Sequence, residues 1–310
     1  MNSRGGFVLV IVLVAVVLLV SLVTVFVSEV YLETGSTRAS LDSTQGSLFA
    51  AGGISGAREL LALELGNRSY TTLNDSWASP ILIKDPKGQG ELKIIIEEEN
   101  SKLNLNAISL PNGRDNQAYF DAGQRLFKQL KLPMEPLYAI ADWIDEEETP
   151  RSGGAEADWY LSQKQPYRPR NKPLLTLEEA KRIKGVAAIF DKIRPFVTVY
   201  GDQAAGSPAA PLNINTAPKE LLMAIDERIS ASMADRIIAF RKETPFKNPA
   251  ELAQVPGMEQ ISTALLTRIS TKGSVYRIRS DGMVNGVTRS IETVVRMNGT
   301  NSTVLYWREY

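Results

Sequence analysis

FVLVIVLVAVVLLVSLVTVFVS, residues 7–28, is an apolar run of 22 residues without a charged side chain. At a rise of about 1.5 Å per residue, a helix of this length spans a bilayer core of roughly 30 Å. One arginine and the α-amino group precede the run in MNSRGG, whereas two acids, Glu29 and Glu33, follow it. This asymmetry predicts a single-pass membrane protein with a cytoplasmic N-terminus and an exported bulk.

The composition restricts the chemistry that the chain can perform. Its 310 residues include 35 basic and 35 acidic ones, so no overall field draws it to nucleic acid or anionic lipid. Because it has no cysteine and no histidine, Ser/His/Asp catalysis, Cys/His catalysis and His-ligated zinc are excluded. A carboxylate or lysine enzyme and a hard-cation site of oxygen ligands remain open.

An α+β fold is predicted beyond the apolar run. Apolar residues recur at spacings of three and four up to about Leu65, which predicts that the N-terminal helix continues that far. Asn285-Gly286 is typical of a tight hairpin. Five segments have the composition of strands: 81–83, 91–97, 274–280, 289–296 and 303–307. We expect a long N-terminal helix packed on an antiparallel sheet, interrupted by a large helical insertion.

The insertion contains an internal repeat. Residues 103–107, LNLNA, match residues 212–217, LNINTA, and residues 176–185 match residues 248–257. In each copy an asparagine precedes the first helix, where its side chain can accept hydrogen bonds from free N–H groups. We predict two related helix-hairpin-helix-like (SAM-like) subdomains, with chance similarity of capping motifs as the alternative.

The second copy also resembles a tandem helix-hairpin-helix DNA-binding unit. Such units bind phosphate through glycine-rich hairpins, but residues 224–230 contain two acids and no glycine. We therefore expect no nucleic acid. The alternative function is a membrane-anchored helix-hairpin-helix DNA-binding protein of a competence-like uptake system.

Gly6 immediately before Phe7 resembles the end of a type IV prepilin leader. In that family a prepilin peptidase cuts after the glycine, and the new N-terminal Phe is methylated, which assigns Gly6 and Phe7 as processing residues. A plain membrane anchor and a cleaved signal peptide are the alternatives. The family usually has Glu five residues after the cut, where this chain has Ile11.

Further stretches extend the resemblance to the type II secretion minor pseudopilin known as general secretion pathway protein K. The matching segments run over nearly the full chain in family order: 6–7, 103–107, 141–145, 154–156, 167–169, 212–218 and 289–296. The resemblance implies a non-catalytic subunit at the tip of the secretion pseudopilus, which initiates or caps its assembly and supports export of folded proteins. Implied partners are minor pseudopilins of the I and J classes, the major pseudopilin, the prepilin peptidase, the inner-membrane secretion platform and inner-membrane lipid.

The resemblance implies a chain that is anchored in the bacterial inner membrane and lies mostly in the periplasm. We divide this chain into six segments. They are the leader (1–6), the transmembrane part of the helix (7–28), the pilin-like helix and first strands (29–102), the first helical subdomain (103–200), the second helical subdomain (201–270) and the C-terminal strands (271–310).

Residues 145–158, DEEETPRSGGAEAD, form an acidic loop in the first subdomain. With Asp145 as position 1, the chain has Glu147 at 3, Thr149 at 5, Arg151 at 7 and Glu156 at 12, the ligand spacing of a calcium loop in which position 7 binds through its carbonyl. The resembled family binds calcium in its helical domain, which favours Ca2+ here. A solvated loop is one alternative, and a hydrolase that pairs Asp142 with Asp145 or Glu147 is another.

Overall fold

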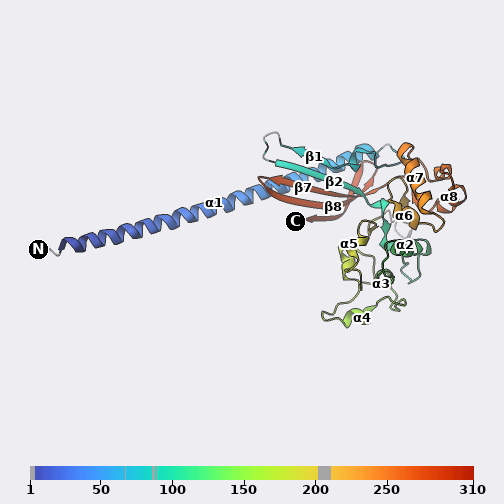
Figure 1. Ribbon diagram of the computed structural model, residues 1–310, viewed down its shortest axis with the longest axis horizontal. Helices are drawn as coiled ribbons and strands as arrows, with labels where there is room; N and C mark the ends of the chain where they lie inside the picture. The colour runs from blue at the N-terminus through green and yellow to red at the C-terminus, as the bar shows by residue number, and fades with distance from the viewer. Residues whose placement is uncertain (1–3, 67, 86–87, 89, 202–210) are drawn as a thin grey trace.

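A single long helix dominates the shape of the molecule. The computed structural model describes residues 4–66, 68–85, 88, 90–201 and 211–310, so parts of the predicted leader, of the turn after residue 84 and of the start of the second subdomain lie outside it. Helix α1 (Arg4–Leu65) has 62 residues and projects from the body as a rod (Figure 1). Its end at Leu65 confirms the predicted continuation beyond the apolar run.

The C-terminal part of α1 lies on a five-stranded antiparallel sheet of order β1-β2-β7-β8-β9. The strands are β1 (Ile81–Lys84), β2 (Gly90–Glu98), β7 (Val275–Val284), β8 (Val287–Asn298) and β9 (Asn301–Glu309). Asn285 and Gly286 both have positive φ, 49° and 84°, as the expected tight hairpin requires. The predicted strands and the pilin-like α+β layout are confirmed.

Small residues let the helix approach the sheet closely. A Cβ placed on Gly282 of β7 would lie 2.3 Å from the carbonyl oxygen of Gly46 in α1. One placed on Gly53 would lie 2.2 Å from the hydroxyl of Ser280. Buried apolar side chains of α1 and the sheet fill the remaining interface: Ala50, Ile54, Ala57, Leu61, Leu65, Ile94, Ile96, Tyr276, Ile278, Ile291 and Val295. Gly46 and Gly53 of α1 are therefore points where the helix backbone contacts the sheet.

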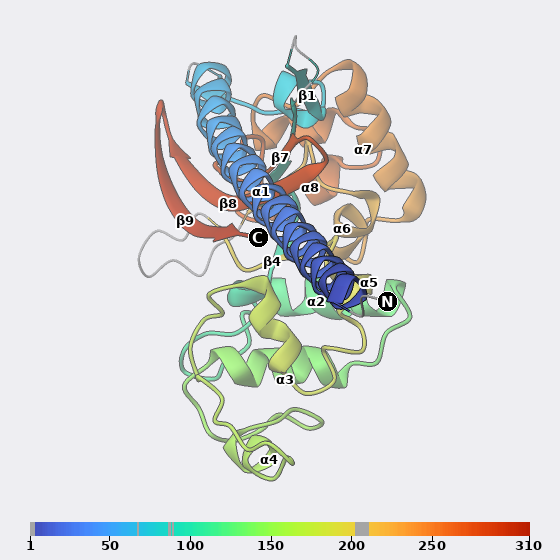
Figure 2. The same cartoon turned by 90° about the vertical axis from the view of Figure 1, so that its left-hand side faces the viewer.

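Two helical units occupy the chain between β2 and β7 and repeat one order of elements. The first contains β3 (Leu103–Asn104), α2 (Gln117–Gln129), α3 (Glu135–Ile144), α4 (Ala157–Leu161), the 3-10 helix η4 (Leu177–Arg182), α5 (Phe190–Ile193) and β4 (Val197–Thr198). The second contains β5 (Leu212–Asn213), α6 (Lys219–Ala224), α7 (Ala231–Glu243), the 3-10 helix η5 (Pro249–Gln254), α8 (Glu259–Leu265) and β6 (Ile269–Ser270). Strands β3 and β4 pair in parallel, as do β5 and β6, and α4 with its flanking loops has no counterpart in the second unit. Figure 1 places both units at the end of the sheet away from the N-terminus of α1, and Figure 2, seen from the N-terminal side, shows the first unit below the sheet and the second to its right.

Equivalent asparagines brace both copies in the same way. The amide of Asn106 accepts from the backbone N–H of Leu174 at 2.8 Å and donates to its carbonyl and to a second carbonyl, each at 2.9 Å. Asn215 makes the same three contacts, accepting from Phe246 N–H at 3.0 Å and donating at 2.8 and 3.2 Å. These side chains staple distant segments and do not cap a helix. The capping contact is made by the other asparagine of each motif: Asn104 accepts from the N–H of Asn106 at 2.9 Å at the start of a 3-10 helix, and Asn213 accepts from the N–H of Asn215 at 3.0 Å.

Glu98, at the end of β2, attaches the second copy to the sheet. Its carboxylate is 3% exposed and accepts hydrogen bonds from Thr71, Asn213 and Thr216 at 2.8–3.1 Å. A Cβ on Gly273 would lie 2.3 Å from this carboxyl group, so the chain must have glycine there to make room. Burial, only partly offset by the hydrogen bonds, raises the pKa of Glu98 to about 7.

Glu99, the next residue, attaches the first copy by different chemistry. It accepts a hydrogen bond from Thr198 of β4 and pairs with Lys102 at 3.1 Å and Arg277 at 3.0 Å. Burial acts to raise the pKa of Glu99, but the two cations and the hydrogen bonds outweigh it and lower the pKa. Two adjacent carboxylates therefore anchor the two helical units.

Candidate functional site

The apolar part of α1 is uncovered. Within the described chain, one helix is long and apolar enough to cross a membrane, and its most apolar 18-residue window has a mean hydropathy of 3.4 with none of it buried. The backbone of Gly6 lies in this helix, and Phe7 is exposed. Ile11 is exposed too, so an apolar side chain faces outward at the position where the resembled family usually has a carboxylate. These features are compatible with a single-pass membrane protein.

The acidic loop leaves the C-terminus of α3 and returns at the N-terminus of α4. Asp145 ends α3 and Glu156 precedes α4. Four of the five predicted calcium ligands, Asp145, Glu147, Thr149 and Arg151, line one surface hollow. Glu156 does not line that hollow; it is buried in the body of the subdomain.

The side chain of Arg151 occupies the centre of the acidic cluster. One terminal nitrogen donates to Asp142 at 2.7 Å and to Asp145 at 2.8 Å. The other donates to Ser109 Oγ and to the carbonyl of Gly113, both at 2.9 Å. Nε donates to Asp115 at 3.0 Å, so five acceptor groups face the five N–H donors of a guanidinium. Its pKa is raised because these acceptors outweigh the cost of burial.

Glu156 has the opposite environment. Both carboxylate oxygens are buried and have no hydrogen-bond partner in the part of the chain that the structure describes. Burial, followed by the charges of Asp142 and Asp145, raises the pKa of Glu156 to about 8. Two unpartnered oxygens beside two further carboxylates suit a hard divalent cation. However, no group of three or more acidic side chains among the described residues is arranged so that it could hold a metal ion.

Sequence reasoning missed two contacts of this loop. It considered only the backbone carbonyl of Arg151, which instead accepts from Gly154 N–H at 2.8 Å, and it did not connect the loop to Asp115. An arginine within an acidic run could have indicated that its side chain pairs with the neighbouring acids. Nothing in the sequence indicated that it also pairs with Asp115, 36 residues earlier. The hydrolase alternative also loses support, since Asp142 and Asp145 are 0% and 1% exposed and share the Arg151 guanidinium.

In both hairpins of the second copy, a backbone N–H group donates to a carboxylate of the same hairpin. The backbone N–H of Arg228 donates to Asp226 at 3.1 Å, and the N–H of Gly257 donates to Glu259 at 2.9 Å. The pKa values of both acids are lowered, that of Asp226 mainly by the hydrogen bonds from Arg228 and that of Glu259 by backbone hydrogen bonds. Amide groups that a DNA-binding hairpin would present to phosphate are therefore occupied, which disfavours the DNA-binding alternative.

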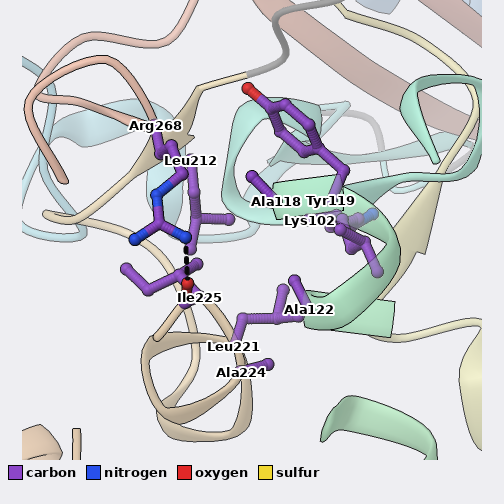
Figure 3. Close-up of a pocket in the computed structure, with 10 residues that line it drawn as sticks. Lys102, Ala118, Tyr119, Ala122, Leu212, Leu221, Ala224, Ile225 and Arg268 are labelled. Carbon is purple, nitrogen blue, oxygen red and sulfur yellow. Dashed lines mark hydrogen bonds between the residues drawn. The ribbon is translucent and has the colours of Figure 1, made fainter. Parts of the chain in front are cut away.

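A small apolar pocket lies where α2 packs against α6 (Figure 3). Ala118 and Ala122 come from α2, and Leu221 comes from α6. At its edge Arg268 donates to the carbonyl of Ile225 at 2.7 Å. None of the lining residues is a carboxylate, so the pocket offers no pair of carboxylates for acid–base chemistry, and it lies at a point of imperfect packing between the two copies.

Comparisons with known proteins agree with this arrangement. Two family models described as type II secretion system protein K match residues 101–202 and 212–272. Type II secretion system protein K of Klebsiella pneumoniae is 27% identical over 85% of this chain and 82% of that protein. The Pseudomonas aeruginosa protein is also 27% identical, over 76% and 73%.

The fold also matches a solved structure. A chain in the crystal structure of the GspK-GspI-GspJ complex from enterotoxigenic Escherichia coli superposes with a TM-score of 0.70 at 23% identity, covering 89% of this chain and 99% of that one. The two family models fall on the two helical units, and the relatives match over most of their own length. The chain therefore belongs to the type II secretion system protein K family, the minor pseudopilins of type II secretion.

Proposed function

We propose that this chain is the tip subunit of a type II secretion pseudopilus and that it initiates or caps fibre assembly. The observation that carries the proposal is Ile11, an exposed apolar residue where fibre subunits of this kind have a carboxylate. A buried carboxylate in lipid needs a partner, so a subunit without one fits a place where one subunit contact is missing. Two helical units at the far end of the sheet (Figure 1) give a bulky head that hinders addition of another subunit above it.

The absence of cysteine provides a direct test of the tip location. Lys164 is exposed, and a Lys164→Cys variant carries the only thiol in the chain. Gold coupled to that thiol should mark one end of each sheared pseudopilus. Label spread along the fibre would refute the tip location while leaving membership in the family intact.

Processing and orientation follow from the same function. A prepilin peptidase cuts between Gly6 and Phe7, Phe7 is methylated, the N-terminus is cytoplasmic and the bulk of the chain is periplasmic. Mass spectrometry of the membrane-extracted chain should find an N-terminal methylated Phe7. A mature N-terminus at Met1, or one beyond Ser28, would contradict this processing. A Gly6→Leu variant should accumulate as uncut precursor and stop secretion.

The chain acts by assembly and not by catalysis. Its partners are minor pseudopilins of the I and J classes, the major pseudopilin, the prepilin peptidase and the inner-membrane platform. The superposing chain was crystallised in a GspK-GspI-GspJ complex, which supports the first of these pairings. Co-purification of the tagged chain with the I- and J-class subunits tests it, and a chain that purifies alone from secreting cells would contradict it.

The acidic loop binds Ca2+ in this proposal. The fit is partial: Glu156 has two free buried oxygens, whereas Asp142 and Asp145 are engaged by Arg151. Asp145, Glu147 and Glu156 are the side chains that would hold the ion, with Thr149 and the Arg151 carbonyl as weaker ligands. The ion would add stability to the folded loop by mass action.

A further inference from the structure

We infer that the Arg151 guanidinium is the resident cation of the acidic loop and competes with a divalent metal ion for Asp142 and Asp145. The inference rests on the calcium site proposed above and concerns how tightly that site binds. Asp142 and Asp145 are almost fully buried, and buried carboxylates are unstable unless a cation or several donors face them.

Arg151 meets that need without a metal. Its side chain reaches Asp142 and Asp145 with one nitrogen and ties both to Asp115 with another. Its own backbone N–H also donates to Asp142, at 3.3 Å. The same residue therefore closes the loop through its main chain and neutralises it through its side chain. A loop built in this way holds its fold in the absence of Ca2+.

The remaining charge explains why a metal ion can still bind. One guanidinium faces three carboxylates, those of Asp115, Asp142 and Asp145. The buried carboxyl group of Glu156, which has no partner among the described residues, can exchange its proton for a divalent ion. A divalent ion at Glu156 would attract Asp142 and Asp145, but it would repel the guanidinium that already holds them. Binding of the ion therefore requires that Arg151 release one or both carboxylates.

The competition predicts opposite effects of one substitution on two measurements. Arg151→Gln keeps the backbone contacts but removes the positive charge and the planar guanidinium group with its N–H donors. Without metal, the full chain in detergent should melt about 5–10 °C lower, since two buried carboxylates lose their cation. Its affinity for Ca2+, measured by calorimetry with CaCl2 alone, should rise about tenfold or more, because a unit charge next to the ion is gone.

Two further variants separate charge from geometry. Arg151→Lys keeps the charge and loses the planar fork, so its metal-free melting temperature should fall while its Ca2+ affinity stays near that of the natural chain. Arg114 lines the same hollow, but no ion pair with an acid is found for it in the described chain. Arg114→Gln should therefore leave the metal-free melting temperature unchanged and raise the Ca2+ affinity far less than Arg151→Gln does.

The outcomes distinguish the two proposals. Tighter Ca2+ binding by Arg151→Gln and not by Arg151→Lys supports the competition. Binding by the natural chain with equal or weaker affinity in Arg151→Gln would overturn the competition and leave the calcium site standing. If no variant binds Ca2+, the calcium site itself is refuted, and the competition with it.

Discussion

Glu98 should make the stability of this chain depend on pH near neutrality. Its carboxylate is buried, accepts three hydrogen bonds from neutral groups and has no Lys or Arg partner among the residues that the structure describes. Burial therefore dominates, and the pKa rises from 4.5 to about 7. Replacing Glu98 by Gln keeps the shape and an acceptor oxygen but removes the proton equilibrium.

The direction in which the folding stability changes with pH follows from proton linkage. Because the pKa is higher in the folded chain, the folded state holds the proton more tightly than the unfolded state. The resulting stability is fully present below about pH 4.5 and is lost as the pH rises through about 7. A shift from 4.5 to about 7 corresponds to at most about 3 kcal/mol, at about 1.4 kcal/mol per pKa unit.

Melting of the full chain in detergent, followed by tryptophan fluorescence between pH 4.5 and 8, measures this dependence. The natural chain should lose stability across the window, and Glu98→Gln should lose clearly less. Glu156, whose pKa is raised to about 8, adds to the slope in both proteins and cancels in the comparison. Equal slopes for the natural chain and Glu98→Gln would refute the reasoning.

The neighbouring acid is the matched control. The pKa of Glu99 is lowered, because Lys102 and Arg277 outweigh its burial. Its contribution is present above the unfolded pKa and lost as the pH falls through the lower folded value. Glu99→Gln should therefore lower the melting temperature at neutral pH and flatten the acid side of the profile, leaving the slope between pH 4.5 and 7 in place.

Three shorter predictions concern other contacts. Asn215→Ala removes three hydrogen bonds of a buried amide and should cost about 2–4 kcal/mol in chemical denaturation; Asn106→Ala should behave alike, and a cost below about 1 kcal/mol for both would argue against the staple. Gly154→Ala places a Cβ 1.9 Å from Asp142 and should destabilise by about 1–3 kcal/mol; a neutral result would mean that the carboxylate moves freely. Glu156→Ala should abolish the rise in melting temperature with Ca2+, and an unchanged rise would exclude Glu156 as a ligand.

Local patterns in the sequence predicted most of the fold. The apolar periodicity of α1 and the Asn285-Gly286 turn depend on neighbours in the chain, and both are confirmed. The repeat was recognisable because capping residues recur at the same spacing: Thr176 and Asn248 both accept from a following backbone N–H. Gly185 and its counterpart Gly257 end the two matching segments, with positive φ angles of 75° and 90°.

Polar contacts between distant residues were not predictable. Glu98 and Glu99 stand at the end of a strand in an ordinary acidic run, and their donors lie up to 178 residues further on. Periodicity cannot reveal such partners, because the direction of each carboxylate depends on how the two helical units dock. Arg151 is similar: its spacing suggested a carbonyl ligand, whereas its side chain lies among the acids.

The two attachment points should behave as separate, specific couplings. Apolar contacts alone would not distinguish two helical units with the same order of elements. The two carboxylates do distinguish them, because Glu98 accepts from Asn213 of the second unit and Glu99 accepts from Thr198 of the first. A double-mutant cycle between Glu98→Gln and Asn213→Ala should therefore give a coupling of about 1–3 kcal/mol. The cycle between Glu99→Gln and Asn213→Ala should give a much smaller value, because no hydrogen bond joins Glu99 to Asn213 in the described chain. Comparable couplings in both cycles would mean that residues 98–100 act as one unit, and the assignment of one carboxylate to each helical unit would be wrong.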